Sequence, residues 1–298
     1  MPYRPPSPYA PRRRPRLTRR GRAAVLAGAL LALAVVTAVP LLLLLPRDRG
    51  PVTPPAPPTL LVPEGWRSTQ VYEAVDRALA LPDGTARAAA TAPAAALGLP
   101  AAAGGNPEGY LFPATYPLPD GTTAEGLLRS MVDTAGRRFG TPATAGAARA
   151  QGLTVHQALI VASIAQAEAD TADDMGKVAR VVHNRLARDM PLQMDSTLNY
   201  ALGRSTVDTT ADDTRIGSPY NTYARKGLPP APIGNPGEQV MAAALRPPAG
   251  DWLYFVTVAP GDTRFTADYA AHRANVAEFN ERRRRAREGA EEGVEGGG

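Results

Sequence analysis

The sequence contains no cysteine and only three histidines among its 298 residues. Without cysteine there is no disulfide framework and no thiol nucleophile, which fits a protein exported without need of disulfides. His156, His183 and His272 include no close pair of the His-x-x-x-His kind, so we expect no metal site and no cofactor. A Gly-x-Ser-x-Gly elbow is also missing, which argues against a serine hydrolase of that type.

Positive charge is concentrated at one end of the chain. The formal net charge is +5, but eight arginines and no acidic residue lie within residues 1–22, so the remainder is mildly acidic. We therefore expect no nucleic-acid partner. Residues 1–22 are better interpreted as a basic cytoplasmic tail that faces anionic lipid.

Residues 23–45 form a long apolar run with no charge and with Thr37 as the only polar side chain. At about 1.5 Å per residue, a helix of this length crosses a hydrocarbon layer about 30 Å thick. The arginines in front of it predict a single-pass protein of the cell membrane, with its N-terminus in the cytoplasm and everything after the run outside. A cleaved signal peptide is the alternative, but the run is too long and no Ala-x-Ala site precedes residue 47, so we expect an uncleaved anchor.

The part after the anchor predicts an α+β protein. Residues 46–58 read as a Pro-rich linker, residues 59–105 as a small α/β unit, residues 106–284 as a larger domain and residues 285–298 as a disordered tail. Within these segments we expect strands at 59–63 and 251–259. Helices are expected near 68, at about 122–138, 154–170 and 173–189, and at about 267–288.

The helix predicted at 154–170 carries a candidate acid. Thr154 is a suitable N-cap, and no Gly or Pro interrupts the following segment. Val161, Ile164 and Glu168 fall on one face, so Glu168 extends an apolar stripe. An apolar setting raises the pKa of a carboxyl group toward the range useful for proton donation. On this pattern alone, however, a glutamate near a helix C-terminus is most often a solvated end residue.

Seven short motifs carry a family resemblance. In chain order they are VPEG (62–65), EGYLFPATY (108–116), ASIAQAE (162–168), NRL (184–186), LQMDSTLNYALG (192–203), SPYNTYARKGLPPAPIGNPG (218–237) and LYFV (253–256). Their order resembles the MltG/YceG family of endolytic murein transglycosylases, membrane-anchored enzymes that cut peptidoglycan glycan strands. The resemblance implies a LysM-like subdomain at 59–105 and a lysozyme-like catalytic transglycosylase domain at 106–284.

One position departs from the family pattern. Members commonly show a Glu-x-Glu pair on this helix, whereas this sequence has Gln166 and Glu168. The two side chains point about 200° apart around a helix, so they cannot share a site. If the family's acid matches Glu168, the protein is an active enzyme. If it matches Gln166, the protein is a non-catalytic glycan-binding cell-wall scaffold with a degenerate cleft. The resemblance to the wider lysozyme-like transglycosylases favours Glu168.

The family implies a reaction that needs a single acid. Glu168 would cleave the MurNAc–GlcNAc bond within nascent strands, giving 1,6-anhydro-MurNAc ends and ending glycan elongation, with cell-wall synthases as further candidate partners. The candidate substrate-binding residues are Gln193, Asp195, Ser218, Tyr220, Asn221 and Tyr223. Alternatively, the tyrosines close the core and Asn221 caps a turn. Asp195 could instead cap a helix, or act as the second carboxylate of an inverting hydrolase.

Overall fold

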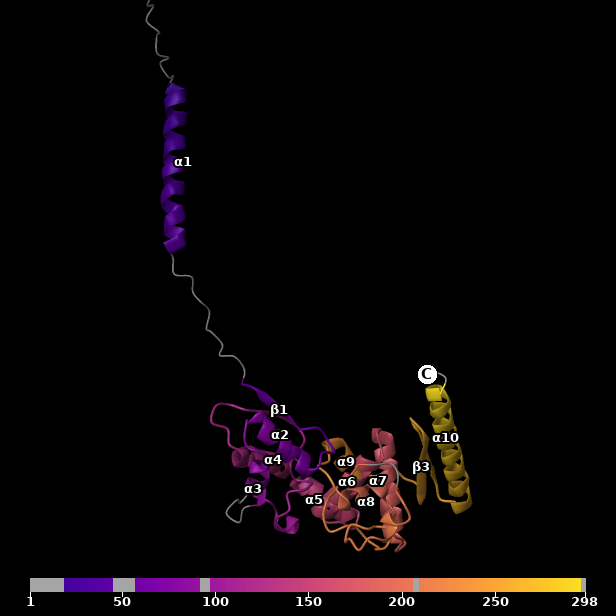
Figure 1. Ribbon diagram of the computed structural model, residues 1–298. Helices are drawn as coiled ribbons and strands as arrows, with labels where there is room; N and C mark the ends of the chain where they lie inside the picture. Colours follow the sequence, from indigo (N-terminus) through magenta and orange to yellow (C-terminus); the bar gives the residue numbers. More distant parts are fainter. Residues whose placement is uncertain (1–18, 45–56, 92–96, 206–208, 296–298) are drawn as a thin grey trace, which may run out of the picture. The chain divides into compact units, whose positions relative to one another are not determined.

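The computed structural model describes residues 19–44, 57–91, 97–205 and 209–295. The chain divides into two units, Met1–Ala56 and Pro57–Gly298 (Figure 1). Most of the predicted basic tail, most of the Pro-rich linker, residue 45 of the predicted anchor and the last three residues lie outside the described ranges.

The first unit contains one helix, α1 (Arg19–Leu44), as far as its residues are described. This helix covers nearly the whole apolar run that was predicted to be helical. Of the helices in the described residues, none combines the length and the apolar character that crossing a membrane requires.

The second unit begins with a small sheet and the helices packed around it. Strand β1 (Thr59–Leu61) pairs antiparallel with β2 (Thr115–Pro117), placing Leu60 opposite Tyr116. Between them lie α2 (Ser68–Ala78), α3 (Thr85–Thr91) and the 3₁₀ helix η1 (Ala101–Ala103), and α4 (Ala124–Phe139) packs against α2 and α3. Residues on both sides of position 105 therefore share one hydrophobic core.

A bundle of helices surrounds α6 (Val155–Glu168). Its neighbours are α5 (Pro142–Ala150), α7 (Ala172–Ala187), α8 (Asp195–Ala201) and α9 (Glu238–Leu245), and the short η2 (Asp213–Arg215) lies in the loop that follows α8. Residues 158–165 of α6 are all buried, because their side chains are almost all apolar and the helix is covered on every side. This central helix is the one that carries Glu168.

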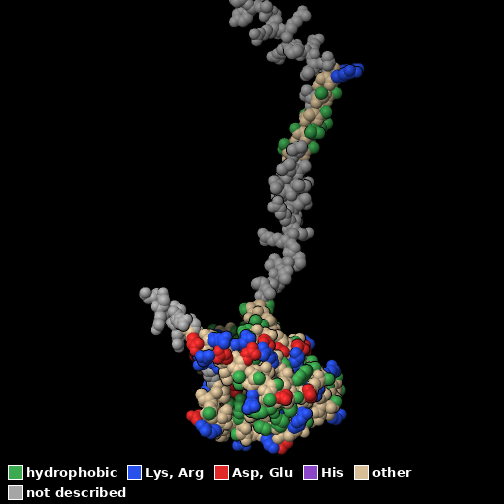
Figure 2. Space-filling model, turned by 90° about the vertical axis from the view of Figure 1, so that its right-hand side faces the viewer, with side chains coloured by type: hydrophobic (Ala, Val, Ile, Leu, Met, Phe, Trp, Pro, Cys, Tyr) green, Lys and Arg blue, Asp and Glu red, His purple; other side chains and the backbone are tan. Residues whose placement is uncertain are grey.

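The chain ends in a hairpin and a long helix. Strands β3 (Tyr254–Ala259) and β4 (Asp262–Thr266) pair antiparallel, and α10 (Tyr269–Glu295) packs beside them (Figure 1). Helix α10 continues well into the segment that was predicted to be disordered from residue 285. Arg282, Arg284 and Arg285 of this helix are paired with glutamates three or four positions away. Basic and acidic side chains lie interspersed on the face shown in Figure 2.

Within the described residues, the protein is thus mainly helical with two small antiparallel sheets, which confirms the α+β class. The helices predicted at 122–138, 154–170 and 173–189 are present as α4, α6 and α7.

Candidate active site

Helix α6 has well-defined ends that place Glu168 at a sharp connection between two helices. Its first turn is closed by a capping box, in which the Gln157 backbone N–H donates to Thr154 Oγ1 at 3.1 Å and the Thr154 N–H donates to Gln157 Oε1 at 2.8 Å. The helix stops because Ala169 is extended (φ −147°, ψ 145°), and Thr171 caps the start of α7. Glu168 is therefore the last residue of α6.

The Glu168 carboxyl group lies at the edge of the core. Val161 and Ile164, on the same face of α6, are fully buried, and Glu168 itself is partly buried. Burial raises the pKa of Glu168 above its ordinary value, while the hydroxyl and the backbone N–H of Ser196 act to lower it and the negative charge of Asp195 raises it further. The Ser196 N–H donates to Glu168 Oε1 at 3.1 Å. Glu168 thus stands at the end of the apolar stripe of α6, where it meets polar groups from the start of α8.

Gln166 lies in a different environment from Glu168. Its Oε1 accepts a hydrogen bond from the Gly237 backbone N–H at 3.2 Å, and its Nε2 lies 3.9 Å from the Met175 sulfur. A Cβ placed on Gly65 would lie 3.3 Å from Gln166 Cγ. Gln166 thus connects α6 to two loops through internal contacts, and none of these contacts is shared with Glu168.

The motifs that begin at residues 192 and 218 lie side by side next to Glu168. The backbone N–H of Gln193 donates to the Thr222 carbonyl at 3.0 Å, and the N–H of Met194 donates to Thr222 Oγ1 at 3.0 Å. The hydroxyl of Thr197 also lies 2.9 Å from Thr222 Oγ1. These bonds fix the start of α8, and with it Asp195 and Ser196, against the loop at 218–223.

Tyr223 is bound to Asp195 within this site. Its hydroxyl donates to Asp195 Oδ1 at 2.5 Å. Burial, followed by the neighbouring Asp195 and Glu168 carboxylates, raises the pKa of Tyr223. The phenol therefore keeps its proton near neutral pH and remains a hydrogen-bond donor to Asp195.

Asn221 has no exposed surface, and its side chain is used inside the loop. Its Nδ2 donates to the carbonyls of Thr214 and Ile216, at 3.0 and 2.9 Å, and its Oδ1 accepts from the N–H groups of Tyr223 and Ala224. This geometry corresponds to the alternative reading of Asn221 as a turn-capping residue.

Ser218 and Gln193 lie at the surface of the same region. Ser218 Oγ accepts from the Tyr220 backbone N–H at 3.2 Å. Gln193 is exposed and has a left-handed backbone conformation (φ 51°), and its Oε1 accepts from Arg185 Nη1 at 3.1 Å. Both side chains keep hydrogen-bonding capacity that these bonds do not use.

Tyr220 packs on a tyrosine that is hydrogen-bonded to a second buried acid, Glu108, to which the sequence analysis gave no role. Its ring packs on Tyr200 with 4.8 Å between centroids, and the Tyr200 hydroxyl donates to Glu108 Oε2 at 3.1 Å. Glu108 is 3% exposed, and burial raises its pKa. Arg67 lies over the Tyr200 ring at 5.3 Å and donates to carbonyls at the end of α8. Glu108 is the first residue of the EGYLFPATY motif, so that motif could have indicated Glu108 from the sequence.

Arg185 is another residue that was given no role. Its guanidinium donates to the carbonyls of Pro191, Leu192 and Leu253 and to Gln193 Oε1. It thus joins α7, the segment before α8 and the start of the hairpin. Arg185 is the middle residue of the NRL motif, so that motif could have indicated its importance.

In the part of the chain that the structure describes, no group of three His, Cys, Asp or Glu side chains is placed to hold a metal ion.

Comparisons with known proteins agree with this arrangement. The profile of the YceG-like family matches residues 41–278. The chain is 39% identical over 166 residues to the endolytic murein transglycosylase of Bacillus subtilis (strain 168), covering 55% of this chain and 46% of that protein. It is 36% identical over 177 residues to the endolytic murein transglycosylase of Streptococcus pneumoniae serotype 2 (strain D39 / NCTC 7466), covering 57% of this chain and 32% of that protein.

Among solved structures, the chain is similar to a YceG-like protein from Listeria monocytogenes, with a TM-score of 0.65 and 32% identity. That match covers 74% of this chain and 76% of the other. The aligned part thus spans only about a third to a half of the length of the curated relatives.

Proposed function

The chain belongs to the YceG-like family, and from this premise we propose that it is a lytic transglycosylase acting on peptidoglycan glycan strands. The observation that carries the proposal is Glu168, a partly buried acid with a raised pKa that lies next to Ser196, Asp195 and Tyr223. The names of the curated relatives, endolytic murein transglycosylases, support the same reaction and substrate.

The proposed mechanism uses Glu168 twice. The protonated carboxyl group donates its proton to the glycosidic oxygen that joins the muramic acid to the next sugar, and the bond from C1 to that oxygen breaks. The ionised Glu168 then accepts the proton of the muramic acid's own C6 hydroxyl, whose oxygen forms a bond with C1. The products are a free hydroxyl on the leaving sugar and a 1,6-anhydro ring, and Glu168 regains its proton.

Asp195 has two roles in this mechanism. Its Oδ1 accepts a hydrogen bond from the Tyr223 hydroxyl and so orients the Tyr223 side chain, and its negative charge raises the pKa of Glu168 and helps to keep that acid protonated. Gln193, Ser218, Tyr220 and Tyr223 are the proposed contacts to sugar. Asn221 is proposed to shape the loop that carries them.

The competing function is a glycan-binding scaffold without activity. Cleavage of uncrosslinked glycan strands by the purified full-length protein separates the two functions. We expect Glu168→Gln to lower the rate by about 10²–10⁴-fold, because the amide cannot supply a proton. Gln166→Ala, the matched control on the same helix, should retain most activity. An inactive Gln166→Ala variant together with an active Glu168→Gln variant would show that Glu168 is not the catalytic acid. A wild-type protein without turnover would favour the glycan-binding scaffold.

The finer aspects of the prediction remain parts of this proposal. They are the LysM-like and lysozyme-like character of the two parts of the compact unit, the cutting of nascent strands at internal positions, the end of glycan elongation and an association with cell-wall synthases. The word endolytic in the names of the curated relatives supports cutting at internal positions, and the order of the seven motifs supports the others as what the family resemblance implies.

We also propose that residues 23–45 anchor the protein in the cell membrane, with the compact unit outside. The eight preceding arginines support this orientation, and Leu26 and Leu31 of α1 are exposed, at 64% and 71%. Protease added to intact spheroplasts should then digest the C-terminal part and spare the arginine-rich end. The opposite protection pattern would reverse the topology.

A further inference from the structure

Three rings meet where the terminal hairpin joins α10. The rings of Tyr254 and His272 are stacked, with 5.1 Å between centroids and 19° between planes, and the Tyr269 ring lies 5.4 Å from Tyr254 and 6.3 Å from His272. Tyr269 is 59% exposed, which is unusual for so large a side chain in the described part of the compact unit. Arg273 lies over the Tyr269 ring at 5.7 Å. We call Tyr254, Tyr269 and His272 the aromatic platform.

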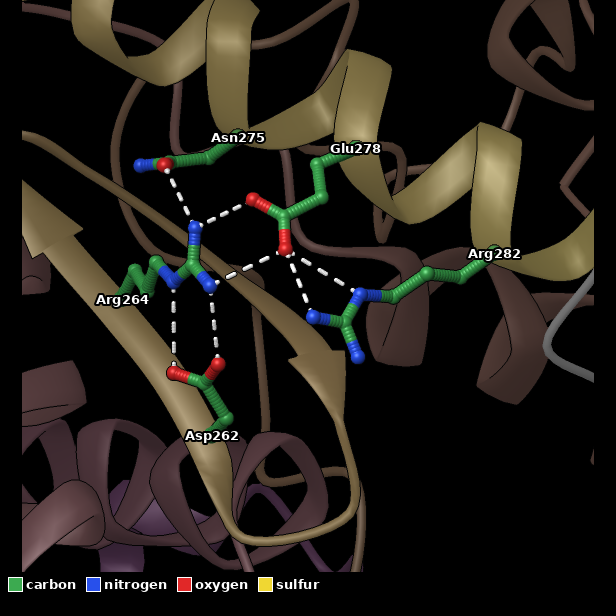
Figure 3. A network of polar contacts seen from close by, with 5 residues as sticks. All are labelled: Asp262, Arg264, Asn275, Glu278 and Arg282. Atoms are coloured by element: carbon green, nitrogen blue, oxygen red, sulfur yellow. Dashed lines mark hydrogen bonds and ion pairs between the residues drawn. The ribbon is translucent and has the colours of Figure 1, made fainter.

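The platform is held in place by the ion network of Figure 3. Arg264 on β4 binds Asp262 on the same strand and both Asn275 and Glu278 on α10, and Glu278 also accepts from Arg282. These bonds fix α10 against the hairpin, so its first turn, with Tyr269 and His272, is fixed too. Binding of a ligand to the platform therefore costs little conformational entropy, because the three rings are already held in position.

The register of the hairpin sets which side chains face α10. Val256 pairs with Arg264 and Tyr254 pairs with Thr266, so these four residues lie on one face of the hairpin. Phe255 and Phe265 pair with each other and belong to the other face. Tyr254 therefore belongs to the face of the hairpin that Arg264 ties to α10.

Arg185 connects the platform to the candidate active site. Its guanidinium lies 5.3 Å from the centroid of the Tyr254 ring and donates to Gln193 Oε1 at 3.1 Å. Its charge also acts on Tyr223, which is bound to Asp195 beside Glu168. Burial and the charge of Arg185 lower the pKa of His272, so its imidazole is neutral near pH 7 and can stack beside Arg185 without repulsion.

We propose that the aromatic platform is a binding subsite for a saccharide ring of the glycan strand, at a distance from the bond that Glu168 cleaves. The inference rests on the proposed function. One face of a pyranose presents C–H groups, which pack well on the negative face of an aromatic ring. The exposed side chain of Gln193, whose Oε1 accepts from Arg185 at 3.1 Å, provides an amide for sugar hydroxyls.

Two sets of kinetics on the full-length protein test the platform. Tyr269→Ala should raise KM for long uncrosslinked strands by about 2- to 12-fold, the equivalent of about 0.5–1.5 kcal/mol for one aromatic contact, with kcat unchanged. Tyr269→Phe should behave as the wild type, because it keeps the ring. Leu61→Ala, which truncates another exposed large side chain on β1, is the matched control and should change nothing. The shortest glycan fragment that the wild type cleaves should be cleaved equally by all four proteins, because it has the fewest sugars beyond the bond that Glu168 cleaves.

Binding of long strands to the Glu168→Gln protein, with and without Tyr269→Ala, distinguishes a failure of the proposed transglycosylase function from a failure of the platform as a saccharide subsite. If the wild type cleaves nothing but Tyr269→Ala still weakens binding, the proposed function fails and the platform stands. If the wild type cleaves long strands and Tyr269→Ala changes neither KM nor binding, the platform is wrong. An equal loss on the shortest cleaved fragment and on long strands would also overturn it, because the substitution would then act on the whole fold and not on a separate subsite.

Discussion

The backbone N–H of Ser196 donates a hydrogen bond to Oε1 of Glu168 at 3.1 Å, although the two residues are 28 positions apart. This bond favours the ionised carboxylate, whereas burial and the charge of Asp195 favour the protonated acid. Burial is the larger influence, so the pKa of Glu168 is raised. The working pH range of the proposed enzyme therefore depends on a balance that single substitutions can shift in either direction.

Ser196→Pro should move the activity profile to higher pH. Proline is tolerated in the first turn of a helix, but it removes both the N–H and the hydroxyl that lower the pKa of Glu168. The acid would then stay protonated at higher pH, and the descending limb of kcat against pH should shift upward. Ser196→Ala removes only the hydroxyl and should give a smaller shift in the same direction. A downward shift would contradict the role assigned to this residue.

Asp195→Asn should shift the same limb to lower pH. The substitution removes a negative charge that raises the pKa of Glu168, while an amide oxygen can still accept from Tyr223. Maximal kcat should remain within a few-fold of the wild type. Tyr223→Phe keeps the charge of Asp195 and serves as the control. A loss of about 10²–10⁴-fold in Asp195→Asn would instead indicate a water-activating base and an inverting hydrolase.

Local signals were sufficient for the central helix but not for the partners of its acid. Thr154 and an uninterrupted segment predicted α6 almost to its last residue, because caps and breakers act within a few positions. Ser196, Asp195 and Tyr223 approach Glu168 only through the packing of α8 and its adjoining loop, which no short pattern contains. The motifs indicated the right segments without giving their contacts.

Contacts between distant segments, which local sequence patterns do not contain, also account for features that were not predicted in other parts of the protein. The partner of β1 is β2, more than 50 residues later, and a three-residue strand has too little pattern to predict its register. Glu108 was visible in a motif, but its role depends on Tyr200, 92 positions away. The helical end of α10 was missed because its composition is typical of disorder, whereas paired charges along the helix stabilise it.

Glu168→Gln should stabilise the fold near neutral pH. Because the pKa of Glu168 is higher in the folded state than the ordinary value of about 4.3, the folded protein binds more protons between the two pKa values. Its stability therefore falls as pH rises through that window, by about 1.4 kcal/mol per unit of pKa difference. The glutamine variant lacks this penalty, so its Tm should exceed that of the wild type at pH 7 and match it at pH 4. A difference that is the same at both pH values would show that charge burial is not the cause.

Gly109→Ala should destabilise the fold strongly. Gly109 has φ +86°, and an added Cβ would lie 2.5 and 2.7 Å from atoms of Pro232. Backbone strain and overpacking each cost about 1–3 kcal/mol, so we expect a loss of at least about 2 kcal/mol in the free energy of unfolding. Gly121→Ala is the control, because Gly121 has φ +81° with nothing within 4 Å of an added Cβ. Equal losses in urea denaturation of the two variants would contradict the predicted clash with Pro232.

The chemical nature of the new glycan ends tests the central claim most directly. A C6 hydroxyl on the same ring has an effective concentration of up to about 10⁵ M when well oriented, far above that of bulk water, so it should capture C1 in preference to water. Mass spectrometry of uncrosslinked glycan treated with the full-length protein should show 1,6-anhydro-muramoyl ends, lighter by one water than hydrolysed ends, and Glu168→Gln should produce none. Reducing ends that accept borohydride as the main product would contradict the transglycosylase mechanism.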